Sequence, residues 1–188
     1  MLNWYFITMI AAFILAGFFY LDNLFIFVIS RLRCHFGSKV LCFFRMASFT
    51  PFVVATLFVI PIIFVFLYLD FFSVVALTLA CLLATGAAFV LKYTFKRVRP
   101  LGHTTYLGKI DSAFPSAHTA GSFVAAFTIA YFWPAWSVPL LALASLVAIS
   151  RMYLELHFFS DVMGGILLAY LMMNLTLDSS LLTFLFGI

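Results

Sequence analysis

Charged residues are scarce in this chain. Of its 188 residues only 9% are Asp, Glu, Lys or Arg, while 66% are hydrophobic. A soluble globular domain is usually about a quarter charged and about half apolar. So few charges cannot cover the surface of a soluble fold, and we expect lipid to solvate most of it. The length allows one domain.

Cysteine is also rare, and we expect no conventional secretory signal at the N-terminus. The three cysteines form no CxxC pair, so we interpret them as small apolar fillers, although the spacing of Cys34 and Cys42 leaves a bridge between them open. No Lys or Arg precedes the first apolar run, and no small-residue cleavage site follows it. The run over residues 4–21 is therefore expected to be a retained membrane span.

Long hydrophobic runs occupy most of the chain. A transmembrane helix needs about 20 largely apolar residues. Six runs approach that length: 4–21, 52–69, 72–92, 118–134, 137–153 and 162–178. Very short connections follow the second and fourth runs, so each joins antiparallel neighbours. The sequence predicts an all-α fold, in which a single membrane domain over residues 1–188 forms a bundle of six transmembrane helices.

Two segments depart from the spanning pattern. Residues 22–50 combine basic residues with apolar residues at helical spacing, which predicts an amphipathic helix at the membrane interface with Asp22 as its N-cap. An ordinary polar loop is the alternative. Residues 93–117 form a long hydrophilic connection, and loops of this length are often functional. We expect this loop to contribute to an active site.

All ten basic residues fall on one side of the predicted membrane, because each follows or closes the first, third or fifth run: Arg31, Arg33, Lys39, Arg45, Lys92, Lys96, Arg97, Arg99, Lys109 and Arg151. The positive-inside rule would place this side in the cytoplasm. A site for anionic head groups would also gather cations. The sequence alone leaves both explanations open.

Four predicted helix ends carry polar side chains to this side. The third run ends at Lys92, the fourth begins near His118, the fifth ends near Arg151 and the sixth begins near Asp161. If the helices bundle, Lys92, Arg99 and Arg151 converge, and two such charges 4 Å apart repel by about 4 kcal/mol at an effective dielectric near 20. An anion between them removes this repulsion, and the arginine fork suits phosphate oxygens. We therefore predict a phosphate or similar oxyanion site.

The same region offers two candidate catalytic histidines. Pro115 and Ser116 are typical of a helix start, where backbone N–H groups can point at an anion. Capping does not explain His118 at the mouth of this helix. His157 and Asp161 are four residues apart, so the carboxylate can accept a hydrogen bond from one imidazole nitrogen and leave the other as a nucleophile.

Three short motifs in this region resemble those of the type 2 phosphatidic acid phosphatase superfamily. Lys92, followed after six residues by Arg99-Pro100, resembles the first motif. Pro115-Ser116-Ala117-His118 is similar to the second, which is usually Pro-Ser-Gly-His. Ser150-Arg151, five residues, His157, three residues and Asp161 match the third. Ala117 departs from the usual glycine, and Glu155 and Phe159 look unusual within the third motif. The resemblance covers roughly residues 50–178.

The resemblance implies a role for each matched residue. His157 would attack phosphorus and form a phosphohistidine, and Asp161 would orient it. His118 would protonate the leaving group and later activate water. Four side chains would bind the phosphoryl oxygens: Lys92, Arg99, Arg151 and Ser116. Pro100, Pro115, Ala117 and Ser150 would support the motifs. The resemblance implies no metal and no cofactor.

The implied function is metal-independent hydrolysis of a lipid phosphate or pyrophosphate. Candidate substrates are undecaprenyl pyrophosphate, phosphatidylglycerol phosphate, phosphatidic acid and lipid A phosphates. The expected partners are this lipid and the bilayer, with no nucleic acid, and the oligomeric state is open. A lipid phosphotransferase using the same intermediate and a non-catalytic lipid-binding membrane protein are the alternatives. The resemblance favours a bacterial inner (plasma) membrane, with the active site on its periplasmic or extracellular face.

Overall fold

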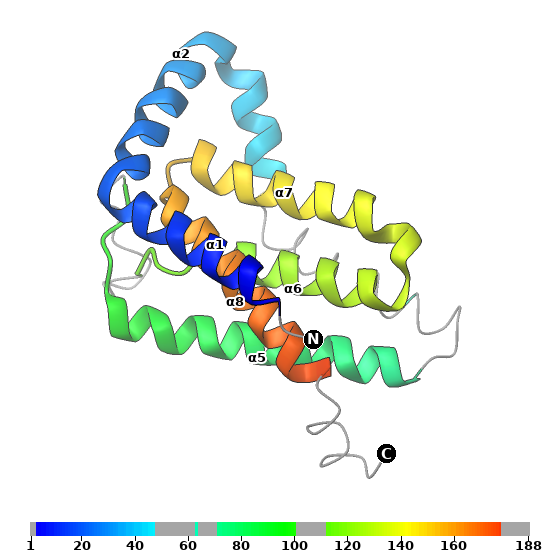
Figure 1. Ribbon diagram of the computed structural model, residues 1–188. Helices are drawn as coiled ribbons and strands as arrows, with labels where there is room; N and C mark the ends of the chain where they lie inside the picture. Colours follow the sequence, from blue (N-terminus) through cyan, green and yellow to red (C-terminus); the bar gives the residue numbers. More distant parts are fainter. Residues whose placement is uncertain (1–2, 48–62, 64–70, 101–111, 178–188) are drawn as a thin grey trace.

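Helices account for nearly all of the described chain (Figure 1). The computed structural model describes residues 3–47, 63, 71–100 and 112–177. Within these ranges there is no strand. The helices are α1 (Trp4–Ala16), a π-helical turn (Gly17–Leu21), α2 (Asp22–Ala47), α5 (Phe71–Phe95), α6 (Ala117–Phe132), a short 3-10 turn (Pro134–Trp136), α7 (Ser137–Tyr153) and α8 (Phe159–Leu177). The predicted all-α class is confirmed.

In the part of the chain that the structure describes, three stretches of helix are long and apolar enough to cross a membrane: Phe72–Phe95, Pro134–Tyr153 and Phe159–Leu177. They correspond to the third, fifth and sixth predicted spans. The fourth predicted span, 118–134, coincides with α6, which has 16 residues. The second, 52–69, lies outside the described residues except for residue 63. A bundle of six spans therefore stays a prediction.

The first predicted span and the segment after it form one continuous helical stretch. α1 passes through the π-helical turn directly into α2. Asp22 has helical backbone angles (φ −60°, ψ −45°), so it is not the predicted N-cap, which would be extended. Its Oδ1 instead accepts a hydrogen bond from the backbone N–H of Ser160 in the first turn of α8, at 2.9 Å. The helical part of the prediction for 22–50 is confirmed over Asp22–Ala47, and its place at the interface stays a prediction.

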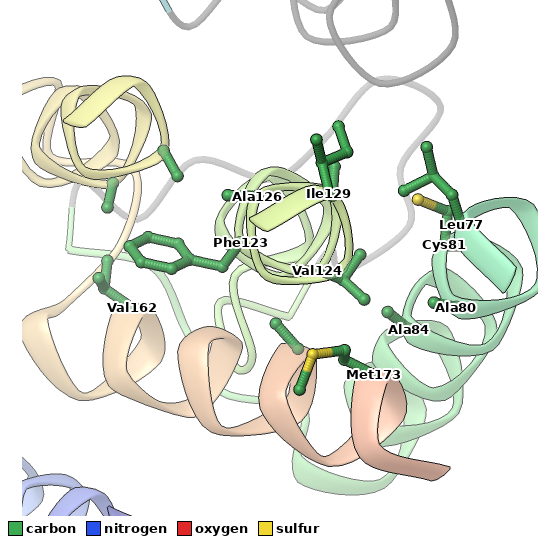
Figure 2. Packing of buried hydrophobic residues seen from close by; sticks show 14 residues of the cluster. Leu77, Ala80, Cys81, Ala84, Phe123, Val124, Ala126, Ile129, Val162 and Met173 are labelled. Atoms are coloured by element: carbon green, nitrogen blue, oxygen red, sulfur yellow. The ribbon is translucent and has the colours of Figure 1, made fainter. Parts of the chain in front are cut away.

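α6 lies at the centre of the described bundle and packs against α5, α7 and α8 (Figure 2). Figure 2 shows Val124 of α6 pointing toward α5 and α8. α5 contributes four fully buried alanines at successive turns, Ala76, Ala80, Ala84 and Ala88. In a membrane, lipid is as apolar as the protein core, so the close approach of small residues drives helix association. The alanine stripe explains why α5 fits tightly against its neighbours.

Two glycines bring α8 close to the segment that opens α6. A Cβ at Gly165 would lie 2.8 Å from the carbonyl oxygen of Ser116, and one at Gly164 would overlap the ring of Phe114. Only glycine permits backbones to approach this closely. The starts of α6 and α8 are thereby held together, and both carry residues of the predicted site.

The continuous helical stretch formed by α1, the π-helical turn and the start of α2, called the N-terminal helix below, packs along α8 (Figure 1). The backbone N–H of Asn3 donates to the hydroxyl of Tyr170 at 2.9 Å, and the rings of Phe6 and Tyr170 lie 4.5 Å apart. At the other end, a Cβ on Gly17 would lie only 2.8 Å from the Cβ of Ser160. The N-terminal helix therefore reaches the first turn of α8, next to Asp161.

Candidate active site

Four helix ends meet at one end of the bundle: the last turns of α5 and α7 and the first turns of α6 and α8 (Figure 1, left). Two described parts of the predicted loop, 96–100 and 112–116, run between them. The backbone N–H of Arg97 donates to the hydroxyl of Ser112 at 2.9 Å, and that of Ala113 donates to the carbonyl of Arg97 at 2.8 Å. Residues 101–111, including His103 and Lys109, lie outside the described residues.

The end of α7 presents His157 to this region. The N–H of Leu156 donates to the carbonyl of Arg151, and the N–H of Glu155 donates to the carbonyl of Met152. These two bonds form a Schellman motif, in which the residue after the C-cap adopts positive φ. Glu155 takes that position with φ 54°. The chain then turns sharply, and His157 is buried between α7 and α8.

The His157 imidazole is held by a backbone carbonyl. Its Nδ1 lies 2.8 Å from the carbonyl oxygen of Ala113. Because a carbonyl only accepts hydrogen bonds, Nδ1 carries the proton and Nε2 keeps its lone pair. The nearest Asp161 oxygen, Oδ2, lies 3.7 Å from Nδ1, too far for a hydrogen bond. The carboxylate faces the ring as predicted, but the hydrogen bond goes to Ala113.

The pKa of His157 is lowered to about 4, mainly because the imidazole is buried. The nearby Asp161 carboxylate raises this pKa in part, whereas the positive charges of Arg151 and Arg99 lower it further. Burial has this effect because a low-dielectric environment disfavours the charged imidazolium. The ring is therefore neutral at pH 7. A neutral, fixed imidazole is the form in which histidine acts as a nucleophile.

Asp161 is fully buried and has a different partner for each oxygen. Oδ1 accepts a hydrogen bond from Nη1 of Arg97 at 2.7 Å, and Oδ2 accepts one from the backbone N–H of Phe158 at 2.8 Å. Asp161 is the third residue of α8, and a carboxylate there commonly reaches back to the N-cap N–H. Its backbone carbonyl also accepts from the N–H of Ser116, at 3.0 Å. Asp161 thus joins the third motif to the second.

The second motif opens α6 as predicted. Ser116 is the N-cap residue, with extended backbone, but its hydroxyl accepts from the Thr119 hydroxyl and caps no backbone N–H. Ala117 is the first residue of the helix, where alanine is favoured, so its departure from glycine causes no backbone strain. His118 follows in the first turn, half-buried. Pro115 lies buried just before the cap.

The predicted cations gather around the two histidines. The charges of Arg151, Lys92 and Arg99 all act on His118, and those of Arg151 and Arg99 act on His157. Arg151 is buried, and the Nζ of Lys92 donates to the carbonyl of Ser112 at 2.8 Å. Pro100 follows Arg99 directly, and Ser150, in the last turn of α7, donates to the carbonyl of Val147. The structure therefore brings the predicted site residues together at one end of the bundle.

Three contributors to this site were not predicted. Arg97 binds Asp161, Asp22 binds Arg97 through its Oδ2 at 2.6 Å, and the carbonyl of Ala113 binds His157. A buried acidic residue in an apolar segment is a candidate functional residue by default. That signal could have marked Asp22. Every residue has a backbone carbonyl, so the residue type at position 113 could not indicate that its carbonyl binds His157.

These features define a class of protein: an all-helical membrane protein with a buried histidine and carboxylate beside clustered cations. The family model of the PAP2 superfamily matches residues 67–181, more than half of the chain, and the chain belongs to this superfamily. The resemblance seen in the three motifs is thus confirmed.

One solved structure is similar over almost the whole chain. It is the crystal structure of the first transmembrane PAP2 type phosphatidylglycerolphosphate phosphatase from Bacillus subtilis, with a TM-score of 0.66 and 22% sequence identity. The alignment covers 92% of this chain and 94% of that chain. At this identity the likeness supports the fold. No curated protein matches the sequence.

Proposed function

We propose that this protein hydrolyses a lipid phosphate or pyrophosphate without a metal ion, through a phosphohistidine formed on His157. The state of that imidazole carries the proposal. Its Nδ1 is bound to the Ala113 carbonyl, and the ring is neutral, which leaves the Nε2 lone pair for attack. A protein that only binds a lipid head group has no need of such a fixed, neutral imidazole next to a buried carboxylate.

The proposed reaction has two steps. In the first, Nε2 of His157 bonds to phosphorus while the bond from phosphorus to the lipid oxygen breaks, and His118 donates a proton to that oxygen. In the second, His118 takes a proton from water, the water oxygen bonds to phosphorus and the N–P bond breaks. Lys92, Arg99, Arg151 and Ser116 would stabilise the negative charge on the phosphoryl oxygens.

The substrate panel follows from the family and the similar structure. Phosphatidylglycerol phosphate comes first, because the similar Bacillus subtilis protein is a phosphatidylglycerolphosphate phosphatase. Undecaprenyl pyrophosphate, phosphatidic acid and a lipid A phosphate complete the panel. We place the protein in a bacterial inner membrane, with the active site on the periplasmic or extracellular face, where bacterial members of the family mostly work.

The test uses purified protein and the four lipids. His157→Ala should lower phosphate release at least ~10³-fold, as expected when a nucleophile is removed. His35→Ala removes a histidine outside the three motifs and serves as the matched control. Rapid quenching with a labelled lipid phosphate should trap label on wild-type protein, in an acid-labile and alkali-stable form typical of phosphohistidine, and none on His157→Ala. Turnover by His157→Ala at the wild-type rate would refute the mechanism.

The same experiment separates the alternatives. A phosphotransferase would move the label to a second lipid instead of releasing inorganic phosphate. A lipid-binding protein without activity would bind the panel, and neither wild type nor His157→Ala would release phosphate. Hydrolysis by wild type, with label on His157, supports the proposal.

A further inference from the structure

Arg97 joins three parts of the fold. Its Nη1 donates to Oδ1 of Asp161 at 2.7 Å and to the hydroxyl of Ser160, and its Nη2 donates to Oδ2 of Asp22 at 2.6 Å. These bonds connect the loop after α5, the first turn of α8 and the start of α2. One guanidinium therefore serves two buried carboxylates that lie on different helices.

The surroundings of Arg97 do not suit a phosphate ligand. Its guanidinium packs over the rings of Phe18 and Phe158, each with a centroid 4.2 Å from Cζ. Its side chain is only 18% exposed. Both terminal nitrogens thus donate to carboxylates within the protein, and two aromatic rings lie against the guanidinium. A phosphoryl group bound through both nitrogens would have to displace Asp161 and Asp22. This distinguishes Arg97 from the cations expected to bind substrate.

The Asp161 carboxylate is oriented by two donors. Arg97 binds Oδ1, the backbone N–H of Phe158 binds Oδ2, and Oδ2 is the oxygen that faces Nδ1 of His157. Rotation of the carboxylate would break both hydrogen bonds. Arg97 therefore helps to fix the orientation in which the Asp161 carboxylate faces the imidazole of His157.

Asp22 holds the other side of the guanidinium. Its side chain is buried, and its Oδ2 also accepts from the Ser160 hydroxyl, at 2.6 Å. Glycine at position 17 lets the N-terminal helix come this close, since a Cβ there would meet Ser160. Asp22 lies outside residues 67–181, which match the PAP2 superfamily.

We propose that Arg97 and Asp22 are positioning residues of the active site: Asp22 holds the guanidinium, and the guanidinium holds the Asp161 carboxylate where it faces His157. The inference rests on the proposed function, in which His157 is the nucleophile. It extends the functional unit to the N-terminal helix. The π-helical turn Gly17–Leu21 contributes by leading the chain past Ser160 to Asp22.

The kinetic test compares Arg97→Gln, Asp22→Asn and the double variant with wild type. We expect kcat to fall about 100-fold for Arg97→Gln and about 10-fold for Asp22→Asn, the rate equivalents of charge-assisted hydrogen bonds. KM should change less than about threefold, because neither residue touches substrate. The double variant should lose little beyond Arg97→Gln, since Asp22 acts through Arg97. Arg31→Gln, which alters an exposed arginine over the ring of Phe27, is the matched control.

Three results would overturn the inference. A raised KM at constant kcat would make Arg97 a substrate ligand. Losses that add independently in the double variant would break the link between Asp22 and Arg97. An unchanged kcat with only a lowered Tm would make both residues structural. If Arg97→Gln does not fold, Asp22→Asn carries both this test and the next, because it keeps the shape of residue 22 and an acceptor for the Ser160 N–H.

Titration of His157 by ¹⁵N NMR gives a readout that needs no turnover. The groups whose charge acts on this ring are Asp161, Arg151, Arg99 and His118. Removing the Arg97 guanidinium leaves the Asp161 charge unshared, so we expect the pKa of His157 to rise in Arg97→Gln. Removing the Asp22 charge leaves the guanidinium to Asp161 alone, so we expect that pKa to fall in Asp22→Asn. An unchanged titration would overturn the inference. If wild type hydrolyses no lipid phosphate, the proposed function fails, and this titration still decides the role of Arg97.

Discussion

Glu155 has a backbone conformation that L-residues rarely adopt. It follows the C-cap of α7 with φ 54°, between Arg151 and His157 of the third motif. Positive φ costs a residue with a Cβ about 1–2 kcal/mol, and glycine avoids this cost. The two backbone hydrogen bonds of the Schellman motif hold Glu155 in this conformation despite its cost. The strain therefore lies in the turn that aims the proposed nucleophile.

Comparing two substitutions at this position isolates the backbone effect. Glu155→Gly and Glu155→Ala both remove the carboxylate, but only glycine relieves the positive φ. We expect Glu155→Gly to be more stable than Glu155→Ala by up to about 1 kcal/mol, because the greater freedom of glycine in the unfolded chain offsets part of the gain. Thermal unfolding in detergent measures the difference. If Glu155→Gly were instead less stable than Glu155→Ala by the ordinary cost of glycine, about 0.5–1 kcal/mol, the turn would hold no backbone strain.

Which site residues could be predicted depends on how far apart they lie in the sequence. His157 and Asp161 are four positions apart, so a single turn of chain, here the one that opens α8, brings them to 3.7 Å. Arg97 and Asp22 are 75 positions apart, and only the packing of the N-terminal helix on α8 joins them. The Ala113 carbonyl belongs to the backbone, so its contact with His157 could not be predicted from the residue type. The motifs indicate the catalytic and phosphate-binding residues. The groups that hold these residues in place come together only in the tertiary structure.

Among the elements, α8 and the start of α6 approach closely at a glycine. A Cβ at Gly165 would lie 2.8 Å from the Ser116 carbonyl oxygen and 3.1 Å from Cβ of Thr119. The backbone of one helix would have to shift. Ser116 and His118 lie at the start of α6 and Asp161 lies in α8, so a shift of either helix should change both the packing and the site.

Gly165→Ala tests this contact against a matched glycine. We expect it to lower the free energy of unfolding by about 1–3 kcal/mol, the usual cost of overpacking, and to reduce turnover. Gly86→Ala is the control, because a Cβ at Gly86 in α5 meets nothing within 4 Å. It should stabilise the helix by about 0.5–1 kcal/mol. Unfolding and activity assays measure both, and equal effects of the two substitutions would argue against a tight α6–α8 contact.

Element boundaries could be predicted where an apolar run ends at polar residues, but not at Asp22, whose carboxylate is buried against another helix. α5, α7 and α8 follow their predicted spans closely, because each apolar run ends at polar residues. At Asp22 the sequence shows a polar residue and predicts a new helix start. The helix continues, because the buried carboxylate takes its partners from Ser160 and Arg97. A partner on another helix leaves no sign in the local sequence.

At the scale of the whole molecule, the basic residues that the sequence predicts on one side of the membrane have two competing explanations. The positive-inside rule would make that side cytoplasmic. The structure gives other reasons for several of them: Arg97 binds two carboxylates, and the charges of Lys92, Arg99 and Arg151 converge on the histidines. Cations held by such contacts are poor indicators of topology. This weakens the cytoplasmic interpretation, and the periplasmic or extracellular face stays our proposal for the site.

Single cysteines at opposite ends of the bundle decide the orientation. Val98 lies beside the site and is 66% exposed, whereas Val138, where α6 turns into α7, is 76% exposed (Figure 1). In a chain with Cys34, Cys42 and Cys81 replaced by alanine, we expect a membrane-impermeant maleimide to label Val98→Cys in intact cells. Val138→Cys should react only after the inner membrane is permeabilised. The reverse pattern would place the site in the cytoplasm, and the lipid phosphate would then have to be hydrolysed at the inner leaflet.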